Sequence, residues 1–214
     1  MRFRLLYSGR LLGASRNDSR AKHKAQIRRE FSPQLERLIQ TKSILRRACC
    51  QQGYNWFNDH PEDRDQINGR DDDDEYRSLM YDFWKRHMSD KWRRGTQSFI
   101  PLVTDKMDIR CGLDILFLRP EEPGMIVGGA DLDNRLKSLL DALRVPDTAD
   151  GFESEDAPIF CLLQDDKLIS EIKVTADQLL LLPKETSVTP NDVFLVVNVN
   201  VEAPPSNIWH QAFA

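Results

Sequence analysis

Three segments in the second half of the chain constrain the fold more than any other part of it. Residues 110–118 alternate polar and apolar side chains, as a half-buried β-strand does. Residues 133–144 repeat leucines at helical spacing, and residues 168–174 are again strand-like. This strand–helix–strand order predicts an α/β (α+β) protein, in which the helix packs across a mixed β-sheet.

The flanking segments add elements to this unit. Residues 2–7 and 193–201 are apolar and strand-like, and turn residues follow the first of them. A helix over residues 18–30 is expected next, with a second helix over residues 32–48, because Ser32 followed by Pro33 combines a typical N-cap with a typical first turn. Two successive helices are therefore predicted.

The segment of residues 51–75 lacks a sustained apolar period and contains Gly53, so a loop is expected there. Its four adjacent aspartates, residues 71–74, lack the alternating ligand spacing of a calcium loop. A solvated surface is therefore expected rather than a metal site. Residues 79–92 then carry large apolar side chains at helical spacing, which favours a helix that faces the core.

Size and hydropathy exclude several classes of protein. A length of 214 residues suits one globular domain. The longest apolar run, residues 179–182, is far too short to span a bilayer, and the apolar N-terminus is interrupted before a signal peptide forms. No membrane partner and a cytoplasmic location are expected. The four cysteines fit neither a disulfide framework nor a zinc site, so reduced thiols are expected: Cys49, Cys50, Cys111 and Cys161.

Charge is segregated along the chain, although the net charge is only −4. Residues 1–48 hold 13 Lys and Arg against 3 Asp and Glu, whereas residues 120–214 hold 6 against 17. The basic N-terminal cluster suits binding to DNA phosphates, and a solvated helix face is an equally good explanation. The candidate DNA-binding residues in it are Arg16, Arg20, Lys22, Lys24, Arg28 and Arg29.

The acidic C-terminal half carries the candidate chemistry. Asp131 precedes the predicted helix and Asp133 begins it. If the chain enters the helix in an extended conformation, these two residues, which are two apart, point to the same side. Asp133, Lys137 and Asp141 are spaced by four, which makes a polar stripe beside the leucine face. A second acidic pair, residues 165–166, stands just before the strand at 168–174.

Carboxylates that converge from two stretches would repel one another, and a bound cation would relieve that repulsion. Their hard oxygen atoms suit magnesium, which supports phosphodiester hydrolysis. Taken singly, each residue also has an ordinary structural explanation. Asp133 can cap the helix, Asp131 can end a loop, residues 165–166 can form a turn, and Lys137 can pair with a neighbouring aspartate.

Residues 131–137 (DLDNRLK), 141–143 (DAL) and 165–167 (DDK) together resemble the signature of the RusA family of Holliday-junction resolvases. The resemblance extends from about residue 110 to the closing strand at 193–201. It implies a RusA-like fold and a homodimer that binds four-way DNA junctions. It also implies symmetric cleavage with Mg²⁺, for which Mn²⁺ is an alternative metal.

The resemblance also implies individual roles. Asp131, Asp133 and Asp166 would be the essential acidic residues and metal ligands, with Asp165 as a supporting ligand. Lys137 would be the active-site lysine, which contacts DNA and steadies the scissile phosphate or the departing oxyanion.

Three features depart from the family pattern. Ala130 stands where a basic residue is expected, and the connection between Leu143 and Gln164 is long and acidic. Residues 41–100 form a helical and acidic-loop insertion within a single domain of residues 1–214. Branch preference and dimer geometry can therefore differ from those of the family.

These observations predict a magnesium-dependent endodeoxyribonuclease that resolves Holliday junctions or related branched DNA. The alternative is a catalytically silent junction-binding protein of the same fold, which would bind without magnesium and leave no nicks. A third interpretation takes residues 131–133 as the Asp-x-Asp motif of a metal-dependent glycosyltransferase. That motif is common, and the chain is small for such a domain.

Overall fold

A computed structural model describes residues 1–13, 18–60, 73–107, 109–120, 132–152, 157–180, 189 and 191–202, without the side chains of residues 18, 19 and 73. The elements are β1 (Arg2–Arg10), α1 (Asp18–Thr41), α2 (Ser43–Asp59), α3 (Asp73–Lys91), β2 (Arg93–Arg94), β3 (Gln97–Val103), η2 (Asp105–Met107), β4 (Arg110–Arg119), α4 (Leu132–Leu143), β5 (Ile159–Leu163), η3 (Asp166–Leu168), β6 (Ile169–Gln178) and β7 (Asp192–Glu202).

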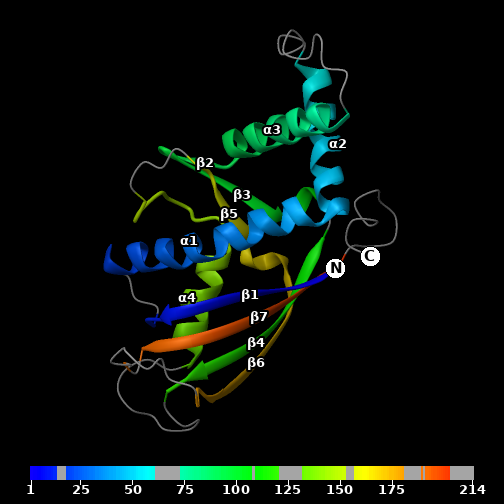
Figure 1. Cartoon of the computed structure of the whole chain (residues 1–214). Helices are drawn as coiled ribbons and strands as arrows, with labels where there is room; N and C mark the ends of the chain where they lie inside the picture. Colours follow the sequence, from blue (N-terminus) through cyan, green and yellow to red (C-terminus); the bar gives the residue numbers. More distant parts are fainter. Residues whose placement is uncertain are drawn as a thin grey trace.

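Seven strands form two sheets among the described residues (Figure 1). The larger sheet has the order β1-β7-β4-β6, and the smaller one has the order β2-β3-β5. In the larger sheet β4 pairs in parallel with β6 and antiparallel with β7, so the predicted mixed sheet with packed helices is confirmed. The predicted strands at 2–7, 110–118, 168–174 and 193–201 correspond to β1, β4, β6 and β7.

The larger sheet buries one face. Leu113, Ile115 and Phe117 of β4 alternate with less buried residues, and at most 2% of each of these three is exposed. Val197 and Val199 of the central strand β7 are buried in the same way. This period of two follows from the pleat of a strand and fixes which face meets the helices.

Residues 18–48 lie in two successive helices, as predicted, but the predicted boundary between them was wrong, because α1 continues through Pro33 to Thr41 and α2 begins at Ser43. Ser32 does not cap a helix. Its buried hydroxyl oxygen accepts a hydrogen bond from the backbone N–H of Phe160 in β5, at 2.9 Å. The Ser-Pro pair therefore lies inside α1, where Ser32 joins the helix to the smaller sheet.

The loop predicted for residues 51–75 was also wrong in its first part, because α2 continues to Asp59. Residues 61–72 lie outside the described residues. Gly53 does not break α2: a Cβ atom added there would come within 1.9 Å of the Met80 carbonyl oxygen of α3. The glycine therefore lets the backbones of α2 and α3 cross closely. Sequence rules that treat one helix alone do not predict such a contact.

Two buried strands were missed by the sequence analysis. β3 and β5 pair in parallel inside the protein, and nearly all their residues are buried. Strands buried on both faces lose the polar–apolar alternation that marks a half-buried strand. Residues 97–100, assigned to the predicted insertion, thus belong to a central strand, while α2 and α3 project from the sheets (Figure 1).

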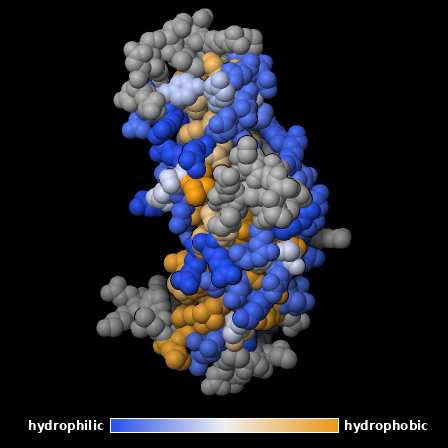
Figure 2. Space-filling model, turned by 90° about the vertical axis from the view of Figure 1, so that its right-hand side faces the viewer, coloured by the Kyte–Doolittle hydropathy of each residue, from blue (hydrophilic) through white to orange (hydrophobic). Residues whose placement is uncertain are grey.

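The helices and sheets share one main apolar core, to which Phe83 of α3, Leu35 of α1 and Val199 of β7 all belong. The four cysteines are buried free thiols, as expected. Among the described residues, every helix is too short or too polar to span a bilayer. Hydrophobic surface gathers at the end of the molecule where the larger sheet lies (Figure 2).

A substitution at the helix crossing tests this packing. Gly53→Ala should lower the free energy of unfolding by about 1–3 kcal/mol, because the new methyl group has no room beside Met80. Helix propensity alone predicts the opposite sign, a gain of about 1 kcal/mol. Urea denaturation measures the difference, with the exposed Gln51→Ala as a control in α2. A Gly53→Ala protein more stable than the wild type would contradict the close crossing.

Candidate functional site

Helix α4 presents the first candidate residues on an exposed stripe. Its buried side carries Leu139, Ala142 and Leu143, whereas Asp133 and Lys137 are exposed. Asp133 lies in the first helical turn, where the positive end of the helix dipole favours a carboxylate. Asp131 lies outside the described residues.

Helix α4 also buries a residue that the leucine pattern did not identify. Only 3% of Arg135 is exposed, and its guanidinium donates to the side-chain oxygen of Asn191 at 3.4 Å, just before β7. Arg135 therefore ties the first half of α4 to the entrance of the central strand.

The second acidic pair lies in the tight turn between β5 and β6. Asp165 is the N-cap of η3, and its side chain accepts a hydrogen bond from the backbone N–H of Lys167 at 3.0 Å. One carboxylate oxygen of Asp165 is thus committed to holding the turn. Asp166 follows in the first turn of η3 with an exposed side chain.

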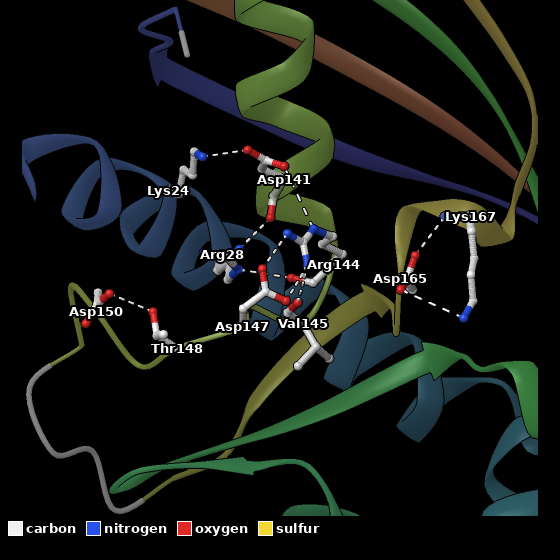
Figure 3. Close-up of polar contacts among 10 residues, drawn as sticks. All are labelled: Lys24, Arg28, Asp141, Arg144, Val145, Asp147, Thr148, Asp150, Asp165 and Lys167. Carbon is white, nitrogen blue, oxygen red and sulfur yellow. Dashed lines mark hydrogen bonds and ion pairs between the residues drawn. The ribbon is translucent and has the colours of Figure 1, made fainter. Parts of the chain in front are cut away.

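Backbone contacts join these two parts. The N–H of Val145, just after α4, donates to the carbonyl oxygen of Leu163 at 2.9 Å. Arg144 forms an isolated parallel β-bridge with Leu163. Leu163 ends β5 two residues before Asp165. The end of α4 is therefore fixed beside the turn that carries the acidic pair (Figure 3).

A shallow hollow of about 410 Å³ lies between one face of α4 and this turn. It is lined by Leu140 of α4, by Asp166, and by the beginning of β6. Lys137 precedes Leu140 by three residues and Asp133 precedes it by seven, so all three share one helix face. Seven residues rise by about 10 Å, so Asp133 lies about two turns from the Asp166 end of this face.

The donor atoms suit a hard cation, but the described residues do not complete a site. Carboxylate oxygens are the ligands that Mg²⁺ takes in proteins. Within the described ranges, no group of three or more His, Cys, Asp or Glu is placed to hold a metal ion. Asp131, the remaining predicted ligand, is not among those ranges.

The structural alternative for Lys137, an ion pair with a neighbouring aspartate, is not found in the part of the chain that the structure describes. Asp141 instead accepts from Lys24 of α1 at 2.5 Å and lies 3.8 Å from the Arg144 guanidinium. Among the described residues, Lys137 has no ion pair with Asp133 or Asp141. Its ammonium is therefore not neutralised by either of these aspartates.

A cluster of charged residues anchors the end of α4, and we call it the α4 anchor. Its members are Lys24, Arg28, Asp141, Arg144 and Asp147 (Figure 3). Arg28 donates to the backbone carbonyl oxygens of Asp141 and of Arg144, the latter at 3.1 Å. These carbonyls end α4 and lack partners within the helix, so a cation from α1 satisfies them and complements the helix dipole.

The two arginines of the α4 anchor differ in environment. Only 5% of Arg28 is exposed, and burial lowers its pKa. Arg144 donates two hydrogen bonds to Asp147, at 3.0 and 3.1 Å, which raise the pKa of Arg144 and lower that of Asp147. The charge of Asp166 also raises the pKa of Arg144, so this carboxylate lies within electrostatic reach of the α4 anchor.

The basic residues predicted to bind DNA are thus only partly available. Arg28 is buried and Lys24 is paired, so both work inside the fold. Arg29 lies over the Phe152 ring, with its guanidinium carbon 4.9 Å from the ring centroid. Lys22 is exposed and Arg20 is half-buried, whereas Arg16 lies outside the described residues.

Sequence spacing contains the signal for the buried arginine. Arg28 falls three residues before Phe31, four before Ser32 and seven before Leu35, all of which are buried. A basic residue within an apolar helical stripe is expected inside the protein, where it needs acceptors.

Comparison with known proteins gives no relative: no family model, no curated protein and no solved structure matches the chain.

A matched pair of substitutions in α1 tests the α4 anchor. Arg28→Gln should lower the free energy of unfolding by about 2 kcal/mol or more, because it leaves buried carbonyl oxygens without a charged donor. Lys22→Gln on the exposed side of the same helix should change it by no more than about 0.5 kcal/mol. Urea denaturation of the two proteins makes the comparison. Equal small effects would mean that Arg28 does not hold α4.

Proposed function

We propose that this chain is a magnesium-dependent endodeoxyribonuclease that resolves four-way or related branched DNA, with a RusA-like fold and as a homodimer. The observation that supports it best is the shared face of α4. Asp133 and Lys137 lie on the helix face of Leu140, and Leu140 lines one hollow with Asp166. This shared face supports the proposal that two acidic stretches distant in sequence serve one site, with about two helical turns between Asp133 and the Asp166 end.

Asp133 and Asp166, with Asp131 and Asp165, would hold Mg²⁺, which when bound supplies an activated water and neutralises charge at a phosphate. Asp165 has a further role, because its carboxylate holds the η3 turn that presents Asp166. Lys137 is exposed, and neither neighbouring aspartate of its helix pairs with it. Its ammonium would steady the scissile phosphate or the departing oxyanion as a point charge.

The α4 anchor supports this proposal through positioning. A site formed by two elements works only when both are held in a fixed relation. Arg28 fixes the end of α4 to α1, and the hydrogen bond from Val145 to Leu163 fixes it to β5. In the homodimer, one such site would serve each of two opposed strands.

A junction-binding protein that does not cut is the second candidate. It is favoured by one observation, that Asp133 lies about two helical turns from the Asp166 end of the shared helix face. Such a protein would bind a four-way junction equally well with and without magnesium and would release no nicked strand.

Substitutions at the acidic site test the nuclease proposal. Asp133→Asn and Asp166→Asn should each reduce Mg²⁺-dependent cleavage of a synthetic four-way junction by roughly a hundredfold or more, through loss of a metal ligand. Lys137→Gln should reduce it by roughly 10²–10³-fold, through loss of charge stabilisation. Asp82→Asn, an exposed aspartate of α3, is the control and should cleave at the wild-type rate.

Cleavage is measured on end-labelled junction, flap and linear duplex DNA, with Mg²⁺, Mn²⁺ or EDTA, and circular dichroism checks folding. A folded Asp133→Asn protein that cuts junctions at full rate would refute the assignment. Wild-type protein that binds junctions but leaves every strand intact in Mg²⁺ would favour the second candidate.

A further inference from the structure

We infer that the hollow between the N-terminal halves of α2 and α3 binds phosphate groups of the DNA backbone. This inference rests on the proposed function. The hollow has a volume of about 600 Å³ and lies on the projecting helix pair, and we call it the arginine hollow. Its described lining residues are Ser43, Arg46, Arg47, Cys50, Asp74 and Arg77.

The described residues that line the arginine hollow carry a net positive charge. Three guanidinium groups from two helices face a single carboxylate, that of Asp74, among the described lining residues. Arg77 lies 3.8 Å from Asp74, but their side chains are 64% and 92% exposed, so this pair is weak. Counted over the described lining residues alone, the net charge is about two positive units.

Neighbouring groups contact the side chain of one of these arginines and the backbone of a second. The guanidinium of Arg46 lies over the Tyr81 ring, 6.0 Å from its centroid. The Cys50 thiol lies at the hollow and donates to the carbonyl oxygen of Arg77 at 3.2 Å. Burial raises the pKa of Cys50, while the charges of Arg46 and Arg77 act to lower it, so both cations are within electrostatic reach of this thiol.

The beginning of α2 adds to the attraction for anions. Lys42 at the N-cap makes no side-chain capping hydrogen bond, and the first turn holds no acidic residue. The N–H groups and the positive end of the helix dipole are therefore not countered by a carboxylate of the helix itself. Lys42 is exposed and extends the positive charge beyond Ser43.

Size and setting favour a nucleic-acid backbone over a single small anion. The hollow is wide for one phosphate group, and its three arginines and Lys42 are exposed. Guanidinium groups bind phosphate oxygens through two donors at once, which suits successive backbone phosphates. The side of the molecule that carries α2 is largely hydrophilic at the level of that helix (Figure 2). In α1, by contrast, Arg28 and Lys24 are used within the fold.

Salt dependence of junction binding tests this surface. Binding of a fluorescent four-way junction is followed by anisotropy in EDTA over a series of salt concentrations. The double variant Arg47→Gln/Arg77→Gln should bind more weakly than the wild type, and its slope of log affinity against log salt should be shallower by about 2. Lys106→Gln/Arg110→Gln removes two exposed cations elsewhere and should keep the wild-type slope.

A second variant, which is expected to strengthen junction binding, tests whether the weaker binding of the double variant comes from loss of folding. Asp74→Asn removes the carboxylate of the hollow, so it should bind the junction more tightly than the wild type. An unchanged slope for the arginine double variant would overturn the inference, and so would a wild-type protein that binds polyglutamate but not DNA.

The two proposals fail separately. An unchanged slope with intact Mg²⁺-dependent cleavage rejects the arginine hollow and leaves the nuclease. The expected slope change without any cleavage supports the hollow and rejects the nuclease.

Discussion

The contact between the buried Arg28 and the last carbonyl oxygens of α4 is the interaction on which the rest of this structure depends. It joins the first long helix to the helix that carries Asp133 and Lys137. Removing this guanidinium from water is costly, and the fold compensates by giving it acceptors at the negative end of a helix. A hydrogen bond from Val145 to Leu163 also ties the end of α4 to β5. The end of α4 therefore has a fixed position relative to the Asp165–Asp166 turn.

This arrangement changes how the charge of the chain is understood. The basic N-terminal region is not simply a DNA-facing surface, because Lys24 and Arg28 offset the carboxylate of Asp141 and the end of α4. Acidic and basic regions that are segregated in sequence thus meet inside the protein. The exposed cations of α2 and α3 are then the stronger candidates for contact with a polyanion, although sequence alone gave them no special role.

The sequence predicted the elements whose patterns are local. The strands β1, β4 and β7 and helix α4 follow from alternation and leucine spacing, since one face of each is buried, whereas the edge strand β6 was predicted although none of its residues is buried. The errors lie where a distant part of the chain decides the outcome. Ser32 meets Phe160, and Gly53 meets Met80, so residues that favour caps and breaks in isolation lie within continuous helices. The polar stripe of α4 could be predicted from the sequence, whereas the α4 anchor, which holds that helix in place, depends on tertiary contacts.

The proposal that Asp133 and Asp166 act on one metal ion is best tested by measuring Mn²⁺ binding with calorimetry. If both residues hold the same ion, Asp133→Asn and Asp166→Asn should each weaken binding strongly, and the double variant should be little worse than either single variant, because both substitutions remove one site. Wild-type protein without measurable binding, or two substitutions whose effects on binding are independent and additive, would contradict it.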